Sequence, residues 1–202
     1  MKNTFVLTAL MMFMALSIFT QVKPTVYDDA DAYEVYSAVL FDEWPVKEAK
    51  AKKLVIGLET TDYPKFGGDR DSGCLQPAKG EEELFAPILK SYVDANKTPS
   101  LLQRKFKTEI PYELVARSEI DTFFKKNGVN GWQDFYAKYP NSGGINNVSA
   151  VGFNADRTRA IVYIGHSCGG LCGGGNYHFL TKTNGKWVAA DWWHGITCMW
   201  NS

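Results

Sequence analysis

The chain has 202 residues, of which 45% are hydrophobic and 14% aromatic, and it carries 22 basic and 22 acidic side chains. This apolar content is sufficient for one hydrophobic core, whereas two full domains would each be small for independent stability. A formal net charge of zero provides no excess of cations to neutralise phosphates or an anionic membrane surface. We therefore expect one domain and no nucleic-acid partner.

The first residues have the features of a secretory signal peptide. Lys2 supplies a positive charge, residues 5–14 form an apolar h-region, and Ala15-Leu16-Ser17 resembles a cleavage site, with cleavage a few residues later, near Gln21, as the alternative. The apolar-leaning stretch from Thr4 to Phe19 has 16 residues, fewer than the roughly 20 that a membrane-spanning helix needs. The sequence thus predicts a signal peptide over residues 1–20.

The mature chain predicted by this cleavage covers residues 21–202. We expect it to form a single α+β domain with no membrane span and to be exported, either to the periplasm or into the medium. In an oxidising compartment cysteines are typically paired in disulfides.

Helical periodicity and short apolar runs organise the N-terminal half. An acidic first turn followed by buried-type residues at helical spacing predicts a helix, and Ser118 is a candidate N-cap for another helix that contains Phe123 and Phe124. A β-branched run predicts a strand, and a stretch dense in Gly, Pro and Asp predicts a loop. The predicted elements are a helix over 28–44, a strand over 53–60, a loop over 62–80, a helix over 81–95, the short helix after Ser118, and a turn or two of helix over 131–139.

The C-terminal half changes to period-two alternation with turn residues between the runs. This pattern predicts four strands over residues 147–154, 159–166, 176–183 and 186–193. Helices first and strands last indicate an α+β fold, with N-terminal helices packed on a C-terminal antiparallel β-meander of about four strands.

The four cysteines, Cys74, Cys168, Cys172 and Cys198, all lie in the predicted mature chain. An even number in an exported protein predicts two disulfides, for which three pairings are possible. In a meander the strands that end near His166 and His194 finish at the same end of the sheet. We therefore expect the three C-terminal cysteines to be neighbours, and Cys74 to be joined to one of them.

Residues 165–169 spell Gly-His-Ser-Cys-Gly, the G-x-S-x-G pattern of the α/β-hydrolase nucleophile. That nucleophile must lead into a helix, but residues 169–175 contain five glycines, which disfavour a helix by about 1 kcal/mol each. In addition, only 23 residues separate Ser167 from Asp191, too few for the intervening βα units of that fold. The α/β-hydrolase fold is therefore not expected.

The residue types of the Gly/Cys segment also suggest a zinc site or a phosphate-binding loop. A zinc site built from His166, Cys168, Cys172, His178 and His194 has suitable donors but no recognised spacing, and export favours oxidation of the thiols. A phosphate-binding loop would need a Lys and a following helix, which are absent here. We expect no metal and no cofactor, and we interpret the glycines as residues that allow a disulfide-bound loop to adopt positive φ angles.

Asn184-Gly185 predicts a two-residue hairpin loop, in which the numbers of paired residues sum to 369. In that register His178 lies directly opposite Asp191, with Cβ atoms about 5 Å apart, close enough for a hydrogen bond. Ser167 joins them on the same face only if it pairs with Asn176 in the preceding hairpin. A small serine hydrolase using Ser167, His178 and Asp191 is thus the alternative function, and a purely structural His178–Asp191 pair is its rival.

One resemblance covers about the last 60 residues. The string Val-Gly-Phe-Asn-Ala-Asp-Arg-Thr-Arg-Ala at 151–160, the Gly-Leu-Cys-Gly core at 170–173 and Gly-Lys-Trp at 185–187 resemble the C-terminal portion of exported bacterial proteins with a domain of unknown function. The resemblance implies a bacterial envelope or secreted protein and brings no catalytic residues. The sequence as a whole favours a disulfide-stabilised binding or structural module of the cell envelope over an enzyme.

Overall fold

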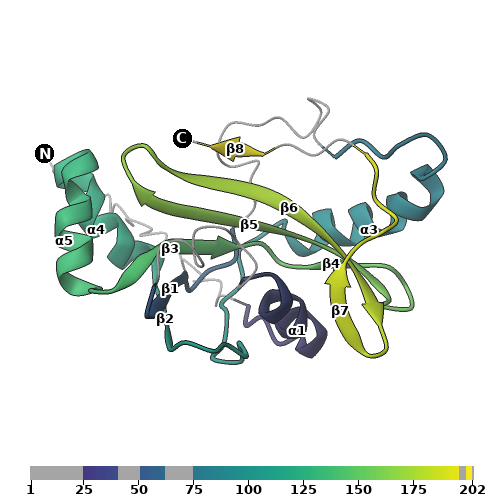
Figure 1. The fold of residues 1–202 in the computed structure, drawn as a ribbon, viewed down its shortest axis with the longest axis horizontal. Coiled ribbons are helices and arrows are strands. Elements are labelled where there is room, and N and C mark those ends of the chain that lie inside the picture. Colours follow the sequence, from purple (N-terminus) through teal and green to yellow (C-terminus); the bar gives the residue numbers. More distant parts are fainter. Residues whose placement is uncertain (1–24, 41–50, 62–74, 196–198, 202) are drawn as a thin grey trace, which may run out of the picture.

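The computed structural model describes residues 25–40, 51–61, 75–195 and 199–201 (Figure 1). The helices are α1 (Ala30–Val39), α3 (Glu82–Ala95), α4 (Arg117–Asn127) and α5 (Gly131–Lys138), with a short 3-10 turn, η2 (Gly128–Asn130), between the last two. The strands are β1 (Lys53–Gly57), β2 (Tyr112–Val115), β3 (Ser142–Val148), β4 (Gly152–Phe153), β5 (Arg159–Gly169), β6 (Cys172–Thr183), β7 (Lys186–Ala189) and β8 (Trp200–Asn201).

The strands form one mixed β-sheet. Its order is β2-β1-β3-β5-β6-β7, with β4 paired to β5 and β8 paired to β6. Strand β1 runs parallel to both β2 and β3, whereas the neighbours from β3 to β7 are antiparallel. The α+β class is confirmed, but the prediction of N-terminal helices packed on a four-stranded antiparallel meander is wrong, because two strands of the N-terminal half belong to the same sheet.

Strand β1 lies inside the sheet because both of its faces are apolar. Val55 is buried in a cluster with α4 and α5, and its neighbours Leu54 and Ile56 are buried in a cluster with α1. A strand that is apolar on both faces is typical of a parallel pairing covered by helices on both sides. Its partners are far away in the chain, since parallel strands need a long crossover connection. The period-two pattern of the C-terminal half therefore did not indicate which strands pair with β1.

The long hairpin of β5 and β6 divides the core into two layers. Even-numbered side chains of β5, such as Val162 and Ile164, pack in the cluster that contains α1. Odd-numbered side chains, such as Ile161 and Tyr163, pack in the cluster that contains α3. Successive side chains of a strand point to opposite faces, so α1 and α3 cover opposite sides of the sheet.

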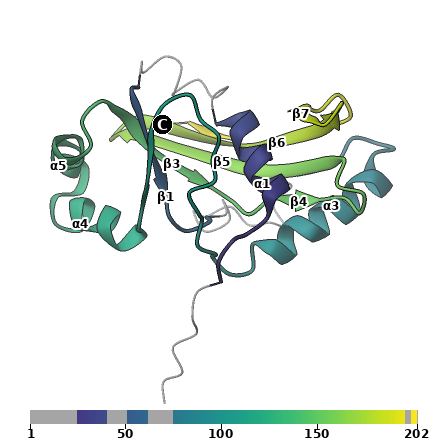
Figure 2. The same cartoon turned by 90° about the horizontal axis from the view of Figure 1, so that it is seen from below.

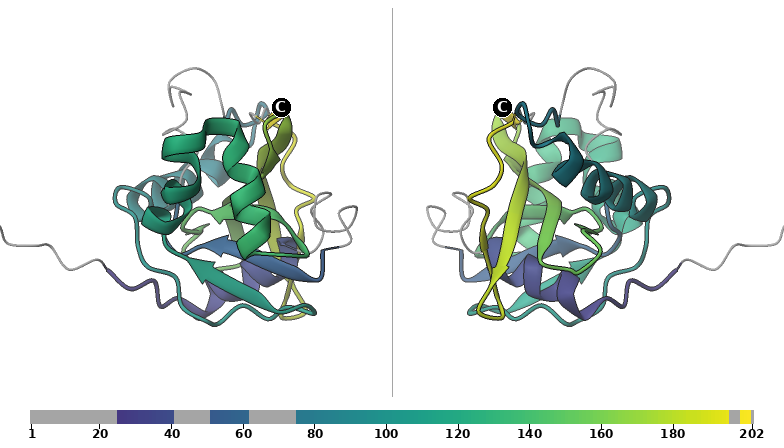
Figure 3. Two further views of the ribbon diagram at one scale, coloured as in Figure 1. Left: turned by 90° about the vertical axis from the view of Figure 1, so that its left-hand side faces the viewer. Right: turned by 90° about the vertical axis from the view of Figure 1, so that its right-hand side faces the viewer.

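Helices α4 and α5 share the α3 face at the other end of the sheet (Figures 2 and 3). Their cluster includes Ile145 of β3, which pairs directly with the odd-numbered Ser167 of β5. Directly opposed residues of an antiparallel pair share a face. The candidate site lies on this same face, between α4, α5 and the sheet.

The sequence predicted the helices well and their ends less well. Helix α3 coincides with the helix predicted over 81–95 and buries Phe85, Ile88 and Tyr92 on one side. Helix α4 begins at Arg117 with Ala116 in the N-cap position, so the prediction that Ser118 caps it is wrong. Within the described ranges, no helix combines the length and apolarity that crossing a bilayer requires.

The C-terminal strands differ from the prediction in length and number. Strands β5 and β6 continue through most of the glycine-rich segment and close in a tight turn at Gly170 and Leu171. The predicted strand over 147–154 is divided into β3 and β4, and β7 ends at Ala189. Cross-strand pairing extends the two central strands wherever a partner is available, which the sequence of each strand alone does not reveal.

An ion-pair network fixes the start of α1 to the sheet. Arg157, in the turn before β5, binds Asp29 at 2.5 Å and Asp31 at 2.6 Å. Lys182 of β6 binds Asp31 at 2.7 Å. Hydrogen bonds from Lys182 and Arg157 lower the pKa of Asp31, whose side chain is 27% exposed. The network joins α1 to two strands at the far end of the sheet from the candidate site.

Replacing Asp31 with Asn should therefore destabilise the fold in a pH-dependent way. The folded-state pKa of Asp31 lies below its ordinary value of 3.8, so its contribution is complete above about pH 4 and is lost as the pH falls through the folded-state pKa. We expect D31N to lower the free energy of unfolding by about 1–2 kcal/mol at pH 7, and the difference from wild type to shrink below pH 3. Urea unfolding between pH 7 and 2.5 measures both quantities.

The matched control is Asp191→Asn, because Asp191 is exposed and has no ion pair among the described residues. This change should alter the free energy of unfolding by less than about 0.5 kcal/mol. A D31N protein that is as stable as wild type at pH 7, or whose deficit is the same at every pH, would contradict the role of the network.

Gly144 is required where β3 passes β5. Its φ of +122° lies in a region that side chains disfavour, and a Cβ there would be 2.3 Å from the carbonyl oxygen of Ser167. The pairing of β1 with β3 also shifts register between Lys53 and Val55, so Gly144 lies in a bulge. This bulge sets how closely β3 approaches the part of β5 that borders the candidate site.

We expect Gly144→Ala to lower the free energy of unfolding by about 3 kcal/mol, the sum of backbone strain and overpacking. Gly185→Ala is the matched control, because Gly185 also has a positive φ, +75°, but has no atom within 4 Å of the added Cβ. Backbone strain alone should lower the free energy of unfolding of Gly185→Ala by about 1 kcal/mol. Urea unfolding of both variants tests this difference, and equal losses would show that the contact with Ser167 is unimportant.

Candidate functional site

A pocket of about 460 Å³ lies between helices α4 and α5 and the sheet. We call it the α4 pocket. Its volume is within the range of pockets that hold small ligands. It is lined by Arg117, Ile120, Phe124, Gly128, Trp132, Ile145, Asn147, Ser167, Gly169 and Gly170.

The helical wall of the pocket is a single stripe of α4. Arg117, Ile120 and Phe124 are spaced i, i+3 and i+7, which places them on one side of the helix. The start of this helix is held by Glu59, whose carboxylate accepts a hydrogen bond of 2.9 Å from the backbone N–H of Arg117. Since Glu59 follows β1, the N-terminal end of α4 is fixed to the carboxyl end of the central parallel strand.

The sheet wall is formed by the α3 face of β3 and β5. Ile145 pairs with Ser167, and Asn147 pairs with Gly165, so these side chains point to the same face. An added Cβ at Gly57 would be 2.8 Å from Oδ1 of Asn147, so the absence of a side chain there makes room for the amide. The sheet wall therefore presents one apolar side chain, Ile145, and two neutral polar side chains, Asn147 and Ser167.

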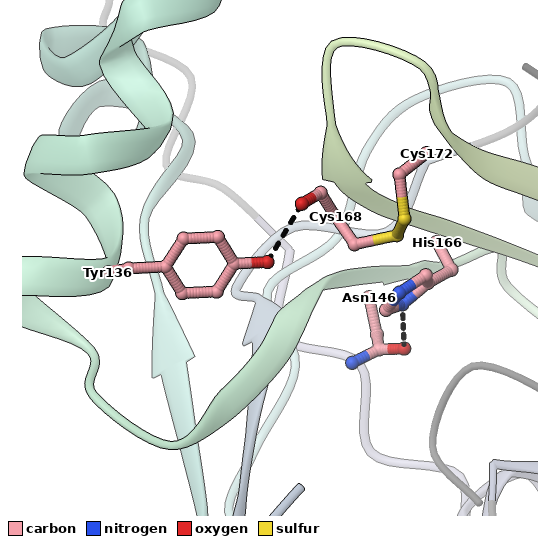
Figure 4. Close-up of a disulfide and its surroundings, with 5 residues drawn as sticks. All are labelled: Tyr136, Asn146, His166, Cys168 and Cys172. Atoms are coloured by element: carbon pink, nitrogen blue, oxygen red, sulfur yellow. Dashed lines mark hydrogen bonds between the residues drawn. A yellow bond between two sulfur atoms is a disulfide. The ribbon is translucent and has the colours of Figure 1, made fainter. Parts of the chain in front are cut away.

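The tip of the β5–β6 hairpin closes one end of the pocket. Cys168 and Cys172 form a disulfide across this tip, with Cα atoms 5.0 Å apart. The hydroxyl of Tyr136 on α5 donates a hydrogen bond of 2.9 Å to the carbonyl oxygen of Cys168 (Figure 4). Burial raises the pKa of Tyr136, which keeps this hydroxyl protonated as a donor. The disulfide and the hydrogen bond together fix Gly169 and Gly170 as the pocket wall.

A second hollow of about 320 Å³ adjoins the α4 pocket. The two share Arg117, Ile120 and Asn147, so they meet at the first turn of α4. The second hollow is more polar at its far side, where Glu59 and two threonines line it. Its lining residues are Gly57, Glu59, Thr60, Thr61, Pro99, Arg117, Ile120 and Asn147.

The structure separates the residues of the predicted hydrolase site. In the β5–β6 ladder His178 pairs with Val162, and Ser167 pairs with Gly173. The register with Ser167 opposite Asn176, which the serine hydrolase requires, is therefore wrong. Ser167 lies five residues beyond Val162, about 17 Å of strand, and odd and even positions point to opposite faces. Ser167 and His178 cannot act on the same substrate atom in this arrangement.

The predicted register of the second hairpin is confirmed, but the hairpin is too short to pair His178 with Asp191. Strand β7 pairs Thr183 with Lys186 and ends with Leu180 opposite Ala189, and each of these pairs sums to 369. One further backbone bond joins Ala190 to Phe179, after which the chain bends and Asp191 is exposed. The ladder pairing of His178 with Asp191 is thus not formed.

His178 instead borders a separate hollow on the α1 face. This hollow of about 250 Å³ lies between the C-terminal end of α1 and strands β6 and β7. Leu180 and Trp187 also line this hollow.

The other candidate ligands of the metal site are dispersed. His166 is buried on the α1 face, and its Nδ1 lies 3.0 Å from Oδ1 of Asn146 (Figure 4). His194 is exposed and pairs with Glu81 at the start of α3, with Nδ1 2.7 Å from Oε1. Cys168 and Cys172 are oxidised. Across the ranges that the structure describes, no three His, Cys, Asp or Glu residues gather as a metal site would require.

The Cys168–Cys172 bridge shows a disulfide-stabilised domain and is one of the pairings that the sequence left open. Cys74 and Cys198 lie outside the described residues, and the prediction that Cys74 joins a C-terminal cysteine stays a prediction. Residues 1–20, the predicted signal peptide, also lie outside them.

The glycines of the hairpin have a different role from the predicted one. None of those between 169 and 175 has a positive φ, so the interpretation that they allow a left-handed loop is wrong. An added Cβ at Gly175 would be 2.0 Å from the hydroxyl oxygen of Tyr163 and 2.5 Å from Nε1 of Trp200. Trp200 donates a hydrogen bond of 2.7 Å to that hydroxyl. These glycines therefore make space for two aromatic side chains on the sheet.

Comparison of this chain with family models, with curated proteins and with solved structures finds no match. The interpretation of the pocket therefore depends on its own residues. Among the described residues that line it, Ser167 alone was a predicted functional residue, and for a different chemistry. The spacing of Arg117, Ile120 and Phe124 was visible in the sequence, but nothing there indicated which elements would face that stripe.

Ser167 should not react as a hydrolase nucleophile. The two histidines nearest in sequence, His166 and His178, both lie on the opposite face of the sheet, so neither can accept its proton. We expect mass spectrometry after incubation with a fluorophosphonate probe to detect no adduct on Ser167, under conditions that fully label a known serine hydrolase. A stoichiometric adduct that is absent from the Ser167→Ala variant would contradict this expectation.

Proposed function

We propose that this protein is an exported binding domain that holds a small, apolar-bodied ligand in the α4 pocket. The observation that carries the proposal is the pocket itself, a space of about 460 Å³ in which four large apolar side chains accompany a few polar groups. Small-molecule sites typically combine an apolar lining with a small number of placed polar groups. The four apolar residues are Ile120, Phe124, Trp132 and Ile145.

The residues of the pocket favour binding over catalysis. The lining residues that the structure describes include no His, Cys, Lys, Asp or Glu, the usual general acids and bases, and Ser167 has no histidine on its face of the sheet. Arg117 is permanently charged, and Asn147 and Ser167 are neutral hydrogen-bonding groups. Such a set can recognise and orient a ligand, and it has no group suited to transfer a proton at neutral pH.

The pocket is also held in place by several independent connections. Glu59 fixes the start of α4, the disulfide fixes the hairpin tip, and Tyr136 joins that tip to α5. A binding site that is formed before the ligand arrives avoids the entropic cost of ordering it. A disulfide as part of the wall suits an oxidising compartment.

The same proposal includes export to the periplasm or the medium. It also places the protein among exported bacterial envelope proteins with a Gly-Leu-Cys-Gly motif. Both parts are supported by the signal-peptide pattern of residues 1–20 and by the motif at 170–173. The motif lies at the hairpin tip, next to the pocket wall formed by Gly169 and Gly170. A ligand-binding role would thus involve the most distinctive part of the resemblance.

The test is binding of an uncharged fluorescent probe, N-phenyl-1-naphthylamine, whose emission rises in an apolar environment. We expect saturable binding to the purified mature chain. Ser167→Phe places a large ring in the pocket and should weaken probe binding about ten-fold or more, which corresponds to roughly 1.4 kcal/mol or more. Titration followed by fluorescence measures the dissociation constant of each protein.

Ser118→Phe is the matched control, because it makes the same change at an exposed position of α4 that does not line the pocket. Its affinity for the probe should equal that of wild type, and thermal unfolding of both variants shows that they are folded. Absence of saturable binding, or equal affinity in the Ser167→Phe variant, would reject the α4 pocket as the binding site.

A further inference from the structure

Among the described residues that line the α4 pocket, Arg117 is the only charged one. It stands at one end of the helical stripe, and Phe124, seven residues later, is about 10 Å further along the helix axis. Phe124 and Trp132 lie edge to face with ring centroids 5.0 Å apart, so the other end of the pocket is aromatic. The pocket therefore has a cationic end and an apolar end.

The guanidinium of Arg117 is only partly used by the protein. Its Nε donates to Oδ1 of Asp121 at 3.0 Å, and the side chain is 57% exposed. Within the part of the chain that the structure describes, no other side-chain bond of Arg117 is formed. Because a guanidinium has five N–H donors, the four on its terminal nitrogens are available to a ligand.

The two acidic side chains near Arg117 bind its Nε and its backbone N–H, and not its terminal nitrogens. Asp121 shares its charge with Lys125, whose Nζ lies 3.2 Å from its second oxygen. Hydrogen bonds from Lys125 and Arg117 lower the pKa of Asp121, in keeping with this shared contact. Glu59 accepts from the backbone N–H of Arg117, which leaves the guanidinium to other partners. Among the described residues, no carboxylate binds the terminal nitrogens of Arg117.

We propose that the ligand of the α4 pocket carries a single carboxylate, which binds the terminal nitrogens of Arg117 while its apolar body extends along α4 toward Phe124 and Trp132. This inference rests on the proposed function of the pocket. A planar carboxylate matches the two parallel N–H groups of a guanidinium. A doubly charged phosphate is disfavoured, because one cation beside Glu59 cannot balance it. Asn147 and Ser167 lie between the two ends and can bind a further polar atom of the ligand.

The test compares ligands that share one body and differ only in the head group. Decanoate, decanol and decylammonium form an acyl series, and 1-naphthylacetate with 1-naphthylacetamide forms an aromatic pair. Displacement of N-phenyl-1-naphthylamine from the mature chain gives the affinity of each. We expect the carboxylate of each set to bind about ten-fold or more tightly than its neutral counterpart, and decylammonium to bind most weakly. If decanoate binds more tightly than 1-naphthylacetate, the body of the ligand is acyl, and the reverse order of affinities indicates an aromatic body.

Substitution of Arg117 assigns the effect to this residue. Arg117→Gln should weaken binding of the carboxylates about ten-fold and weaken binding of decanol and of the probe much less. Arg117→Lys keeps the charge without the paired N–H geometry, so its loss should be smaller. Arg104→Gln is the control, because Arg104 is exposed and lies outside the pocket. It should bind every ligand as wild type does.

The possible failures are distinguishable. If the probe and all the ligands fail to bind, the proposed function is wrong. If the probe binds but carboxylates and neutral compounds bind equally, or Arg117→Gln has no effect, then binding in the pocket stands and the carboxylate inference is wrong. Tightest binding of decylammonium would likewise overturn it. Retained probe binding by Arg117→Gln shows that this variant is folded.

Discussion

The parallel pairing of β1 with β3 is the constraint on which the rest of the structure depends. It brings a strand of the N-terminal half into the middle of the sheet, where the apolar residues on both of its faces are covered. The same pairing fixes Glu59 at the carboxyl end of β1, where it holds the first turn of α4. The position of the helical pocket wall therefore follows from a strand pairing between segments almost ninety residues apart in the chain.

Close backbone approach is the second feature that shapes the candidate site. Gly144 lets β3 pass within contact distance of the carbonyl of Ser167, and Gly57 leaves space for Asn147. On the neighbouring strands, Gly175 accommodates Tyr163 and Trp200. Gly57 and Gly175 remove side chains from the α3 face of the sheet, which leaves space for Asn147 beside the α4 pocket and for the rings of Tyr163 and Trp200.

The chemistry of the pocket follows from how charge is distributed around it. Most ion pairs of the described chain are intrahelical pairs or belong to the network at the start of α1. Among the described residues that line the pocket, Arg117 is the only charged side chain, with Asp121 at its Nε and Glu59 at its backbone N–H. A partly satisfied guanidinium beside aromatic rings fits the proposed recognition of an amphiphilic anion.

The sequence by itself determined the α+β class and most helices, because these depend on local periodicity. It also determined the hairpin register at Asn184-Gly185 through turn chemistry, and the presence of a disulfide through the number of cysteines. Only the tertiary structure decided that β1 and β2 join the sheet, that Ser167 and His178 lie on opposite faces, and that Arg117 borders a pocket. A one-residue difference in register reverses the face of every side chain, and no local pattern determined the register of the long glycine-rich hairpin. The pocket lies between α4, α5, β3 and β5. Its position depends on packing between these segments, and the sequence of one segment does not indicate which others it contacts.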